Sequence, residues 1–356
     1  MKDKIAYIVT FHCVPNYGAV LQTYGLQEYL KTVVKEVRIL DYRPNALLKD
    51  YRNINYYSVG SVVMSLYSML PFLAKKRAFS KFEKRMNLSV ITGKQARDFK
   101  NVKCDYLFCG SDQIWNPNVT DDFDPVYFGA FPMNDTPKVI SYAASLGKSI
   151  FSNKELYQMR KLLEHVDAIS VREKEAQKIL KDYLGIESVL VADPTILANP
   201  EVFKSLVKDV RYRNYLFVYT LTNNPRTLQV AKQVADMKGL LIVQVNGNRK
   251  SLSKSSHIII HDAGPEEFLS LLYHADFVVT DSFHGTVFSN LFHVPYITIP
   301  HKTRGGRMVS LLTELGMQNR LTEFSDICEI PIDWADVDDN IRRIRDISIH
   351  FINQSL

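Results

Sequence analysis

The sequence, 356 residues long, lacks the short signatures of several large enzyme classes. No G-x-G-x-x-G follows the first predicted strand, which argues against a nicotinamide or flavin cofactor. A P-loop lysine motif and a G-x-S-x-G elbow are also missing, which argues against nucleotide triphosphatases and α/β hydrolases. No His, Cys and carboxylate spacing suggests zinc. We therefore expect neither a cofactor nor a metal, and we find no internal repeat.

Cysteine is scarce, and the pattern of the four cysteines does not indicate pairing or metal binding. They are Cys13, Cys104, Cys109 and Cys328, and no two form a C-x-x-C pair. We interpret them as free, mostly buried thiols in a reducing cytoplasm. The first residues, Met1 to Lys4, lead directly into a strand without the pattern of a signal peptide. We therefore expect a cytoplasmic protein.

One long stretch, 56–74, contains no charged residue. It is long enough to cross a bilayer, but its four serines, its glycine and Pro71 make it a poor spanning helix. A basic amphipathic stretch follows, with Lys75, Lys76, Arg77, Lys81, Lys84 and Arg85 interleaved with Phe72, Phe79, Phe82 and Met86. Two interpretations are open for it. One is a helical excursion packed on the first domain with a solvated basic face. The other is a surface that rests on an anionic membrane or a lipid-linked substrate.

Composition and length indicate a soluble globular protein of two domains. Hydrophobic residues make up 46% and charged residues 23% of the chain, and the length exceeds one typical core. The net charge of +6 favours anionic partners without choosing among metabolites, lipid and nucleic acid.

Apolar runs that end in small or polar residues predict strands of two parallel sheets. The predicted strands of the first sheet are 5–10, 37–41, 106–109, 139–143, 168–171 and 189–191. Those of the second sheet are 215–220, 241–245, 257–260, 277–280 and 296–299. Helices are predicted over 20–30, 227–237, 265–274 and 336–351, and Asn199-Pro200 marks the linker.

This pattern predicts an α/β fold of two Rossmann-like domains facing each other across a cleft, as in glycosyltransferases of the GT-B type. We place the first domain at 1–198, with the basic helical excursion 43–100, and the second at 199–335. The last segment, 336–356, is a charged amphipathic helix that we expect to return to the first domain.

The stretch 275–290 is the strongest candidate for a site. A buried strand, Phe277 to Val279, breaks into Thr280-Asp281-Ser282 and re-enters a helix. Ligands bind at the carboxyl ends of parallel strands, and helix N-termini attract anions. His284 then lies where a phosphate or carboxylate would dock. The alternative is that His284 only caps the helix.

Six separated motifs carry a family resemblance. They are Asn16-Tyr17-Gly18-Ala19-Val20-Leu21-Gln22, Gly110-Ser111-Asp112-Gln113-Ile114-Trp115-Asn116-Pro117, Ser141-Tyr142-Ala143-Ala144-Ser145, Ile169-Ser170-Val171-Arg172-Glu173, Ala192-Asp193-Pro194-Thr195 and Asp281-Ser282-Phe283-His284-Gly285. Taken together and in this order, they resemble the polysaccharide pyruvyl transferase family from the first strand to Arg307.

The resemblance implies transfer of a pyruvyl group from phosphoenolpyruvate to a sugar, usually as a ketal that bridges two hydroxyls. It implies a GT-B-like fold with no metal, and it assigns the family's histidine to His284 and its arginine to Arg172. Many members have Arg-Leu-His in the late motif, whereas this chain has Ser282-Phe283-His284. Another cation must therefore hold the donor, or the donor differs.

The donor side is expected in the second domain. Phosphoenolpyruvate carries a phosphate and a carboxylate, and arginine's planar fork matches either group. The donor-binding candidates are Arg172, Ser282, Gly285, Lys302, Arg304 and Arg307, of which the last three are the substitutes for the missing arginine. Alternatives remain open: Arg172 forms an ion pair with Glu173 or Glu175 on a helix surface, and the 302–307 set is a solvated turn.

Catalysis is assigned to His284, which titrates near neutral pH, with Asp281 fixing its tautomer or instead capping the helix. The acceptor-binding candidates in the first domain are Asn16, Gly18, Ser111, Asp112 and Trp115. Asn16 and Gly18 equally suit an ordinary tight turn, and Trp115 equally suits the core.

The sequence thus predicts a pyruvyl transferase of surface polysaccharide biosynthesis, whose acceptor glycan is either free or lipid-linked. Its expected partners are phosphoenolpyruvate and that glycan, with peripheral contact to an anionic inner membrane face and no nucleic acid. The alternatives are a GT-B glycosyltransferase that uses a nucleotide sugar and a non-catalytic family member.

Overall fold

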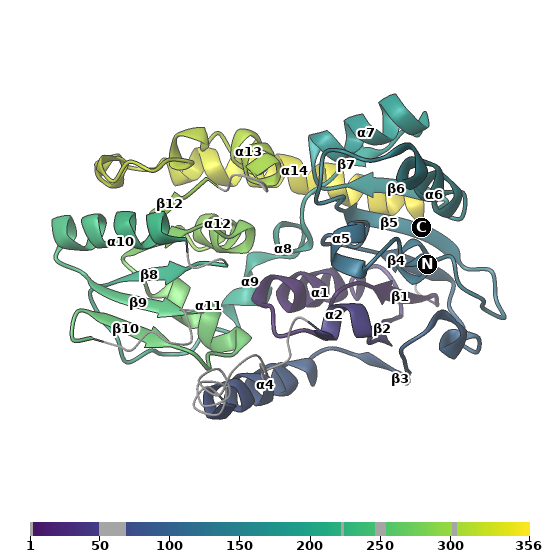
Figure 1. Ribbon diagram of the computed structural model, residues 1–356, viewed down its shortest axis with the longest axis horizontal. Helices are drawn as coiled ribbons and strands as arrows, with labels where there is room; N and C mark the ends of the chain where they lie inside the picture. Colours follow the sequence, from purple (N-terminus) through teal and green to yellow (C-terminus); the bar gives the residue numbers. More distant parts are fainter. Residues whose placement is uncertain (1–2, 50–68, 222–223, 246–253, 301–304) are drawn as a thin grey trace. The chain divides into compact units, whose positions relative to one another are not determined.

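The computed structural model describes residues 3–49, 69–221, 224–245, 254–300 and 305–356 (Figure 1). Contacts divide the chain into two units. Unit 1 comprises Met1–Arg52, Glu83–Asn199 and Arg342–Leu356, and unit 2 comprises Asn53–Phe82 and Pro200–Ile341. We predicted that the whole basic excursion, 43–100, belongs to the first domain. In the structure, helix α4 (Met69–Glu83) groups with unit 2 up to Phe82.

Unit 1 is built on a seven-stranded parallel sheet with the order β3-β2-β1-β4-β5-β6-β7. Its strands are β1 (Ile5–Val9), β2 (Glu36–Tyr42), β3 (Leu88–Gly93), β4 (Tyr106–Cys109), β5 (Lys138–Ala144), β6 (Ala168–Val171) and β7 (Val189–Leu190). Strand β1 pairs with β2 on one side and with β4 on the other. The strand order therefore reverses between β1 and β4, which is where ligands bind in sheets of this type.

Six of these strands follow the predicted apolar runs, because both faces of a parallel sheet are covered. All four residues of β4 are buried, for example. Strand β3 was not predicted, and the expectation of a purely helical excursion over 43–100 is wrong there. Leu88–Gly93 mixes exposed and buried positions, as suits a strand at the edge of a sheet.

The remaining elements of unit 1 connect these strands. They are the helices α1 (Tyr17–Leu30), α2 (Asn45–Lys49), α5 (Pro117–Thr120), α6 (Asn153–Leu163), α7 (Lys174–Leu184) and α8 (Pro194–Leu197), and the 3₁₀ turns η1 (Ala96–Phe99) and η2 (Pro125–Phe128). The core between them is rich in aromatic rings. Phe11 and Tyr42 both meet Tyr127 edge to face. The four cysteines are free thiols, as expected.

Unit 2 holds a five-stranded parallel sheet with the order β10-β9-β8-β11-β12. The strands are β8 (Tyr215–Tyr219), β9 (Leu241–Val245), β10 (His257–Ile260), β11 (Phe277–Thr280) and β12 (Tyr296–Thr298). Strand β8 pairs with both β9 and β11, so the order reverses between β8 and β11. This is the Rossmann arrangement again, and it places the predicted stretch 275–290 at the reversal.

The helices of unit 2 are α4, α9 (Pro200–Lys204), α10 (Pro225–Lys238), α11 (Pro265–Tyr273), α12 (Phe283–Leu291), α13 (Gly305–Glu314) and the start of α14 (Trp334–Ser355), with the 3₁₀ turns η3 (Gln318–Arg320) and η4 (Asp326–Glu329). None of the helices in the described part of the chain combines the length and apolarity that crossing a bilayer requires. Residues 56–68 of the uncharged stretch 56–74, which we interpret as a poor spanning helix, lie outside the described residues.

The last helix, α14, returns to the first domain as predicted, because residues 342–356 belong to unit 1. Arg345 Nε donates to the carbonyl of Ile196 (2.8 Å), and Ser348 Oγ accepts from the backbone N–H of Ala192 (2.8 Å). At the end of the chain, Tyr106 donates its hydroxyl hydrogen to the carbonyl of Leu356 (2.6 Å). The helix is thus bonded to the first residue of β4 and to the segment that follows β7.

Candidate functional site

The predicted site of unit 2 is a tight turn between β11 and α12. Ser282 is the N-cap residue, with φ −99°, and its hydroxyl accepts from the backbone N–H of Gly285 (3.4 Å). The backbone N–H of Ser282 in turn donates to Thr280 Oγ1 (3.0 Å). The alternative that Asp281 caps this helix is therefore wrong. Ser282 is the last residue in the extended conformation, and the helix begins at Phe283.

Asp281 instead joins the two strands at the reversal of the sheet. Its carboxylate accepts from Thr220 Oγ1 (2.7 Å) and from the backbone N–H of Leu221 (2.8 Å), both directly after β8. Asp281 is buried. These bonds fix the end of β8 against the end of β11, and they hold the turn that carries Ser282.

Gly285 allows α12 to lie close to β11. A Cβ atom added at this position would lie 2.5 Å from Thr280 Oγ1, a distance at which something must shift. The same hydroxyl donates to the carbonyl of Tyr219 (2.6 Å) at the end of β8. A glycine is therefore required for packing at this point, whatever ligand the turn binds.

His284 lies in the first turn of α12 and is buried, with 8% of its surface exposed. Its ring meets the ring of Phe283 edge to face, with the centroids 5.3 Å apart. The guanidinium of Arg307 in α13 lies 6.0 Å from the centroid of the same Phe283 ring. A cation from the predicted 302–307 set thus lies beside the Ser-Phe-His triplet, while Lys302 and Arg304 lie outside the described residues.

The chemistry of this turn suits an anion. Helix α12 has nine residues and no acidic residue in its first turn, and helix N-termini attract negative charge. The turn therefore combines N–H groups, an imidazole and a nearby guanidinium.

The reversal in unit 1 holds a second group of predicted residues around Ser111. Thr10 Oγ1 donates to the Ser111 carbonyl (2.9 Å), and Gln22 Nε2 donates to Thr10 Oγ1 (2.9 Å). The backbone N–H of Ser111 donates to Gln22 Oε1 (3.2 Å), and its own hydroxyl donates to the Ala143 carbonyl (2.9 Å). Ser111 is completely buried, so its hydroxyl braces the strand ends.

Arg172 lies at the end of β6 among three carboxylates. Nη1 donates to Asp193 Oδ2 (2.6 Å), Nε donates to Glu173 Oε1 (3.3 Å), and Nη2 lies 3.7 Å from Asp112 Oδ1. Burial opposes its charge, but these carboxylates outweigh burial and raise the pKa of Arg172. The alternative of an ion pair with Glu173 is present, but the pair is buried rather than on a helix surface. Donor binding by Arg172 stays a prediction. The guanidinium that would bind the donor also donates hydrogen bonds to Asp193 and Glu173.

Asp112 is the most exposed of the three carboxylates. Its side chain is 14% exposed, against 7% for Glu173 and 0% for Asp193. Its φ of +72° lies in the left-handed region, which Asp tolerates better than most residues. The backbone N–H of Gln113 donates to Oδ1 (2.8 Å), and the Asp112 carbonyl accepts from the N–H of Ser145 (3.0 Å). This carboxylate is held firmly and still has an exposed edge.

The other acceptor candidates have structural partners. Trp115 is completely buried, stacks on Phe128 with centroids 5.3 Å apart, and donates its indole N–H to the Tyr127 carbonyl (3.2 Å). The suggestion that Trp115 stacks on a sugar is therefore wrong. Asn16 caps α1 by accepting from the N–H of Ala19 (3.3 Å). Gly18 lies inside the helix, which begins at Tyr17 rather than after Gly18 as predicted.

A buried pair near the same strand ends was missed. His12 Nε2 lies 3.0 Å from Asp41 Oδ1, and His12 Nδ1 lies 3.2 Å from the Thr10 carbonyl oxygen. Asp41 also accepts from Thr92 Oγ1 (2.6 Å) and Arg43 Nε (2.6 Å). Burial opposes ionisation of Asp41, but the hydrogen bonds from His12 and Thr92 and the charge of Arg43 lower its pKa to about 2. Nothing short-range in the sequence links these residues.

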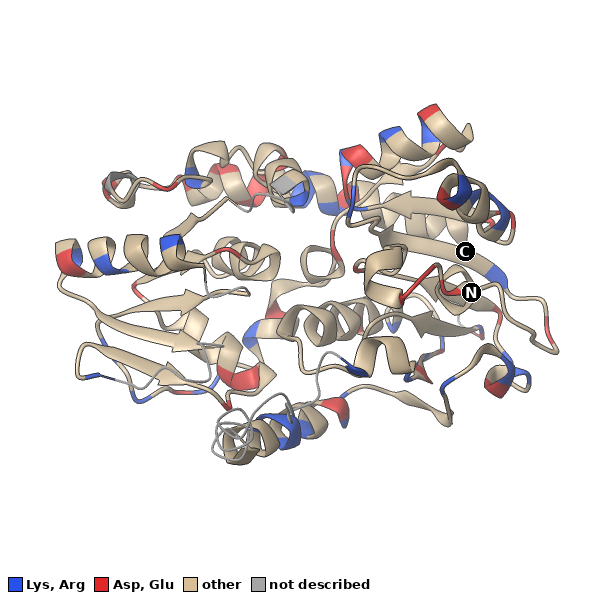
Figure 2. Cartoon of the chain, viewed as in Figure 1, with Lys and Arg blue, Asp and Glu red and all other residues tan. Residues whose placement is uncertain are grey.

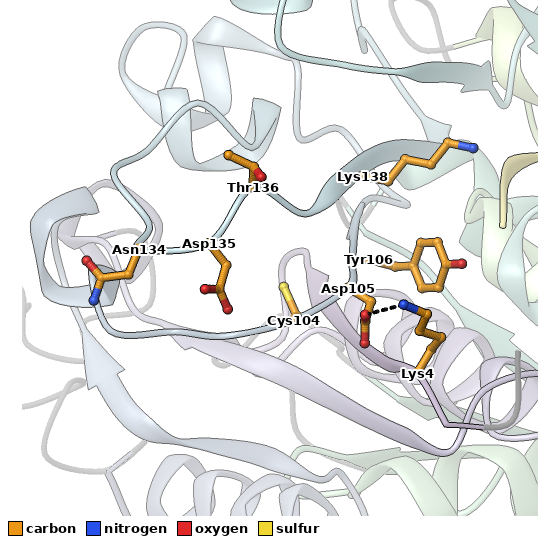
Figure 3. Close-up of a pocket in the computed structure, with 8 residues that line it drawn as sticks. All are labelled: Lys4, Cys104, Asp105, Tyr106, Asn134, Asp135, Thr136 and Lys138. Atoms are coloured by element: carbon orange, nitrogen blue, oxygen red, sulfur yellow. Dashed lines mark hydrogen bonds and ion pairs between the residues drawn. The ribbon is translucent and has the colours of Figure 1, made fainter.

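A polar pocket lies at the opposite ends of the unit 1 strands (Figure 3). It is a cavity of about 610 Å³ lined by Lys4, Cys104, Asp105, Tyr106, Asn134, Asp135, Thr136 and Lys138. Lys4 Nζ pairs with Asp105 Oδ1 across 2.7 Å. Residues 4, 105 and 138 precede or begin β1, β4 and β5, so this pocket contains none of the predicted site residues. Among the residues the structure describes, no group of three or more metal-ligating side chains is found.

Comparison with known proteins agrees with this architecture. The model of the polysaccharide pyruvyl transferase family matches residues 16–303, and the chain belongs to that family. No curated protein sequence matches the chain.

Two solved structures show the fold. One is the UDP-GlcNAc 2-epimerase from Methanocaldococcus jannaschii in complex with UDP-GlcNAc and UDP, with a TM-score of 0.52 and 14% identity over 96% of this chain and 99% of that chain. The other is the UDP-GlcNAc 2-epimerase from Neisseria meningitidis bound to UDP-GlcNAc, with a TM-score of 0.51 and 12% identity over 99% of both chains. The fold is thus of the GT-B type with two Rossmann-like domains, as predicted.

Proposed function

We propose that the protein transfers a pyruvyl group from phosphoenolpyruvate to two hydroxyls of a sugar, forming a ketal, in the biosynthesis of a surface polysaccharide. The family membership supports a polysaccharide pyruvyl transferase in general. The observation that carries the finer proposal is the β11–α12 turn, where His284, the start of α12 and Arg307 lie around Phe283. That combination suits a small donor with two anionic groups.

The reaction needs two proton movements that a histidine near neutral pH can serve. One sugar oxygen adds to C2 of phosphoenolpyruvate while C3 accepts a proton. The second oxygen then displaces the phosphate from C2, so that one hydroxyl proton ends on C3 and the other leaves with inorganic phosphate. We assign the proton transfer to C3 to His284. Asp281 positions the turn through Thr220 and Leu221, and its contact with the imidazole stays a proposal.

Donor binding is assigned to the N-terminus of α12 with Ser282 and Gly285, and to Arg307 together with Lys302 and Arg304. Ser282 stands where the Arg-Leu-His triplet of many members has its arginine, and its side chain is used as a helix cap. Arg307 is the described cation beside the triplet, and we therefore propose it as the main substitute. Arg172 is retained as a donor-binding candidate.

The acceptor glycan is assigned to unit 1, where Asp112 offers a partly exposed carboxylate that can bind hydroxyl groups. The other acceptor-side candidates, Asn16, Gly18 and Ser111, are proposed to support this site indirectly, by holding the start of α1 and the strand ends in place. We further propose that the protein works in the cytoplasm with no metal or cofactor, on a glycan that is either free or lipid-linked.

The test measures donor consumption and ligand-induced stabilisation together. Release of inorganic phosphate from phosphoenolpyruvate is followed with a panel of 4-nitrophenyl glycosides and lipid-linked glycans, and the product is checked by mass spectrometry for an added pyruvyl group. Phosphoenolpyruvate is expected to raise the melting temperature of the protein.

The same measurements address the two alternatives. Stabilisation by a uridine diphosphate compound without any response to phosphoenolpyruvate would favour a nucleotide-sugar glycosyltransferase, an idea that the UDP-GlcNAc epimerase fold keeps open. No response to either compound and no turnover would favour a non-catalytic member.

A further inference from the structure

Helix α4 has one face that packs on unit 2 and one that does not. Phe79 and Phe82 are buried on the packed face, and Lys75 lies half-buried with Nζ 5.7 Å from the Phe79 ring centroid. Ala78 meets the start of α11 so closely that a Cβ atom on Gly264 would lie 2.7 Å from the Ala78 Cβ. These contacts fix which side of α4 turns away from the protein.

The opposite face is a continuous basic stripe with a leucine pair at one end. Its positions recur at three- and four-residue spacing, as one side of a helix requires. All of them are exposed: Leu70, Leu73, Lys76, Arg77, Ser80 and Lys81, with Lys84 and Arg85 in the turn that follows the helix. Leu70 is 75% and Leu73 is 40% exposed. Figure 2 shows the blue band of cations along this helix.

No carboxylate neutralises this stripe from within α4. The single acid between residues 69 and 86 is Glu83, which is half-buried and lies 3.6 Å from Arg43 Nη2. Five exposed cations lie within ten residues, 76–85, beside two exposed leucines. Such a face is complementary to an anionic surface that also accepts apolar side chains.

We propose that this face of α4 docks the protein on an anionic lipid bilayer, with Leu70 and Leu73 entering the headgroup region. A nucleic acid fits less well, because binding of single strands relies on exposed rings, and Phe79 and Phe82 both point inward. Exposed leucines have no partner on a phosphate backbone, whereas they gain from burial at the bilayer interface. The inference is independent of the proposed reaction.

The expected strength follows from the charges. Each Lys or Arg near an anionic leaflet strengthens binding about fivefold, and salt screens this part. Neutralising all five cations should then weaken vesicle binding by at least about 100-fold. The leucines supply a smaller part that does not depend on salt.

The experiment is flotation of the full chain with vesicles of phosphatidylcholine alone and of phosphatidylcholine mixed with phosphatidylglycerol, at low and high salt. The test variant replaces Lys76, Arg77, Lys81, Lys84 and Arg85 by Gln. The matched control replaces five exposed lysines elsewhere, which are Lys35, Lys100, Lys154, Lys178 and Lys232, so that the net charge changes equally. A third variant, Leu70→Ser with Leu73→Ser, tests the apolar part. Melting curves confirm that each variant folds.

The inference predicts that wild type and the matched control float with the anionic vesicles at low salt. It also predicts that the test variant does not float, and that the leucine variant is weakened at every salt concentration. Absence of wild-type flotation at low salt overturns it. So does equal flotation of the test variant. Binding of a DNA duplex that competes fully with the vesicles, with no effect of the leucine substitutions, would instead assign the stripe to nucleic acid.

Discussion

Arg172 Nη1 and Asp193 Oδ2 are joined by a hydrogen bond of 2.6 Å between two buried side chains. The other oxygen of Asp193 accepts from the N–H and the hydroxyl of Thr195 in the first turn of α8, so Asp193 is the N-cap residue of that helix. The pair therefore links the end of β6 to the beginning of α8. Arg172 therefore stabilises unit 1, whether or not it also binds the donor.

Replacement of Arg172 by Ala is expected to destabilise unit 1 strongly. It leaves Asp193 and Glu173 as buried carboxylates without their cation, a change that typically costs about 3–5 kcal/mol. Urea denaturation of wild type and Arg172→Ala measures the loss. A loss below about 1 kcal/mol would show that the ion pair does not brace the fold.

Arg172→Lys separates the donor role from the structural one. Lysine keeps the charge near Asp193 but cannot reproduce a planar fork, so a bidentate donor contact would be lost. We expect weaker binding of phosphoenolpyruvate in calorimetry while most of the stability remains. Equal affinity for wild type and Arg172→Lys would remove Arg172 from the donor site.

His284→Ala is expected to lower turnover by on the order of 10²–10⁴-fold, the usual contribution of a general acid or base. The melting temperature should change little, because the helix cap is supplied by Ser282. His274→Ala is the matched control, since His274 is exposed at the end of α11 and has no assigned role. Turnover that is unchanged in folded His284→Ala would exclude the assignment.

The strands could be predicted because each one is a continuous run of apolar residues in the sequence, long enough to be distinguished from the polar segments around it. Phe277–Thr280 and Leu241–Val245 were predicted at their observed bounds. Strand β3 was not predicted, because it has no continuous apolar run. It lies at the edge of the sheet, mixes buried and exposed residues, and follows a basic helix.

The site was predictable only where its residues are neighbours in the chain. Ser282, His284 and Gly285 come from one motif, and Arg307 from one nearby. Asp281 was considered as the helix cap, but its carboxylate accepts hydrogen bonds from Thr220 and Leu221, and Ser282 caps the helix instead. These two partners follow β8, about 60 residues earlier in the chain, so the local sequence does not reveal them. The His12–Asp41 pair has the same origin, since it forms only when β1 and β2 lie side by side.

Asp41 should make stability depend on pH in the acid range. Its pKa is lowered from 3.8 to about 2 in the folded protein, so the ionised form is favoured by folding. The resulting stabilisation, about 2 kcal/mol, is present above pH 3.8 and is lost as the pH falls toward 2. Urea denaturation across this range, compared with Asp41→Asn, checks it. The difference between the two proteins should shrink as the pH falls, and a constant difference contradicts the prediction.

Asp112 provides the sharpest test of the acceptor side. Asn is the appropriate replacement, because it tolerates the left-handed backbone at φ +72° and removes only the charge. Arg172 keeps Asp193 and Glu173 as partners, so Asp112→Asn should melt within a few degrees of wild type. If Asp112 binds acceptor hydroxyls, pyruvyl transfer to the best 4-nitrophenyl glycoside should fall at least about 10-fold, mainly through a higher KM for the sugar.

The donor supplies the internal control for this variant. Phosphoenolpyruvate should bind Asp112→Asn nearly as tightly as wild type, because the assigned donor groups around α12 are unchanged and Arg172 keeps Asp193 and Glu173 as partners. Asp112→Ala is expected to be less stable than Asp112→Asn, since alanine tolerates the positive φ poorly and cannot accept from the N–H of Gln113. An Asp112→Asn protein with wild-type KM and turnover for the sugar would place the acceptor elsewhere in the chain.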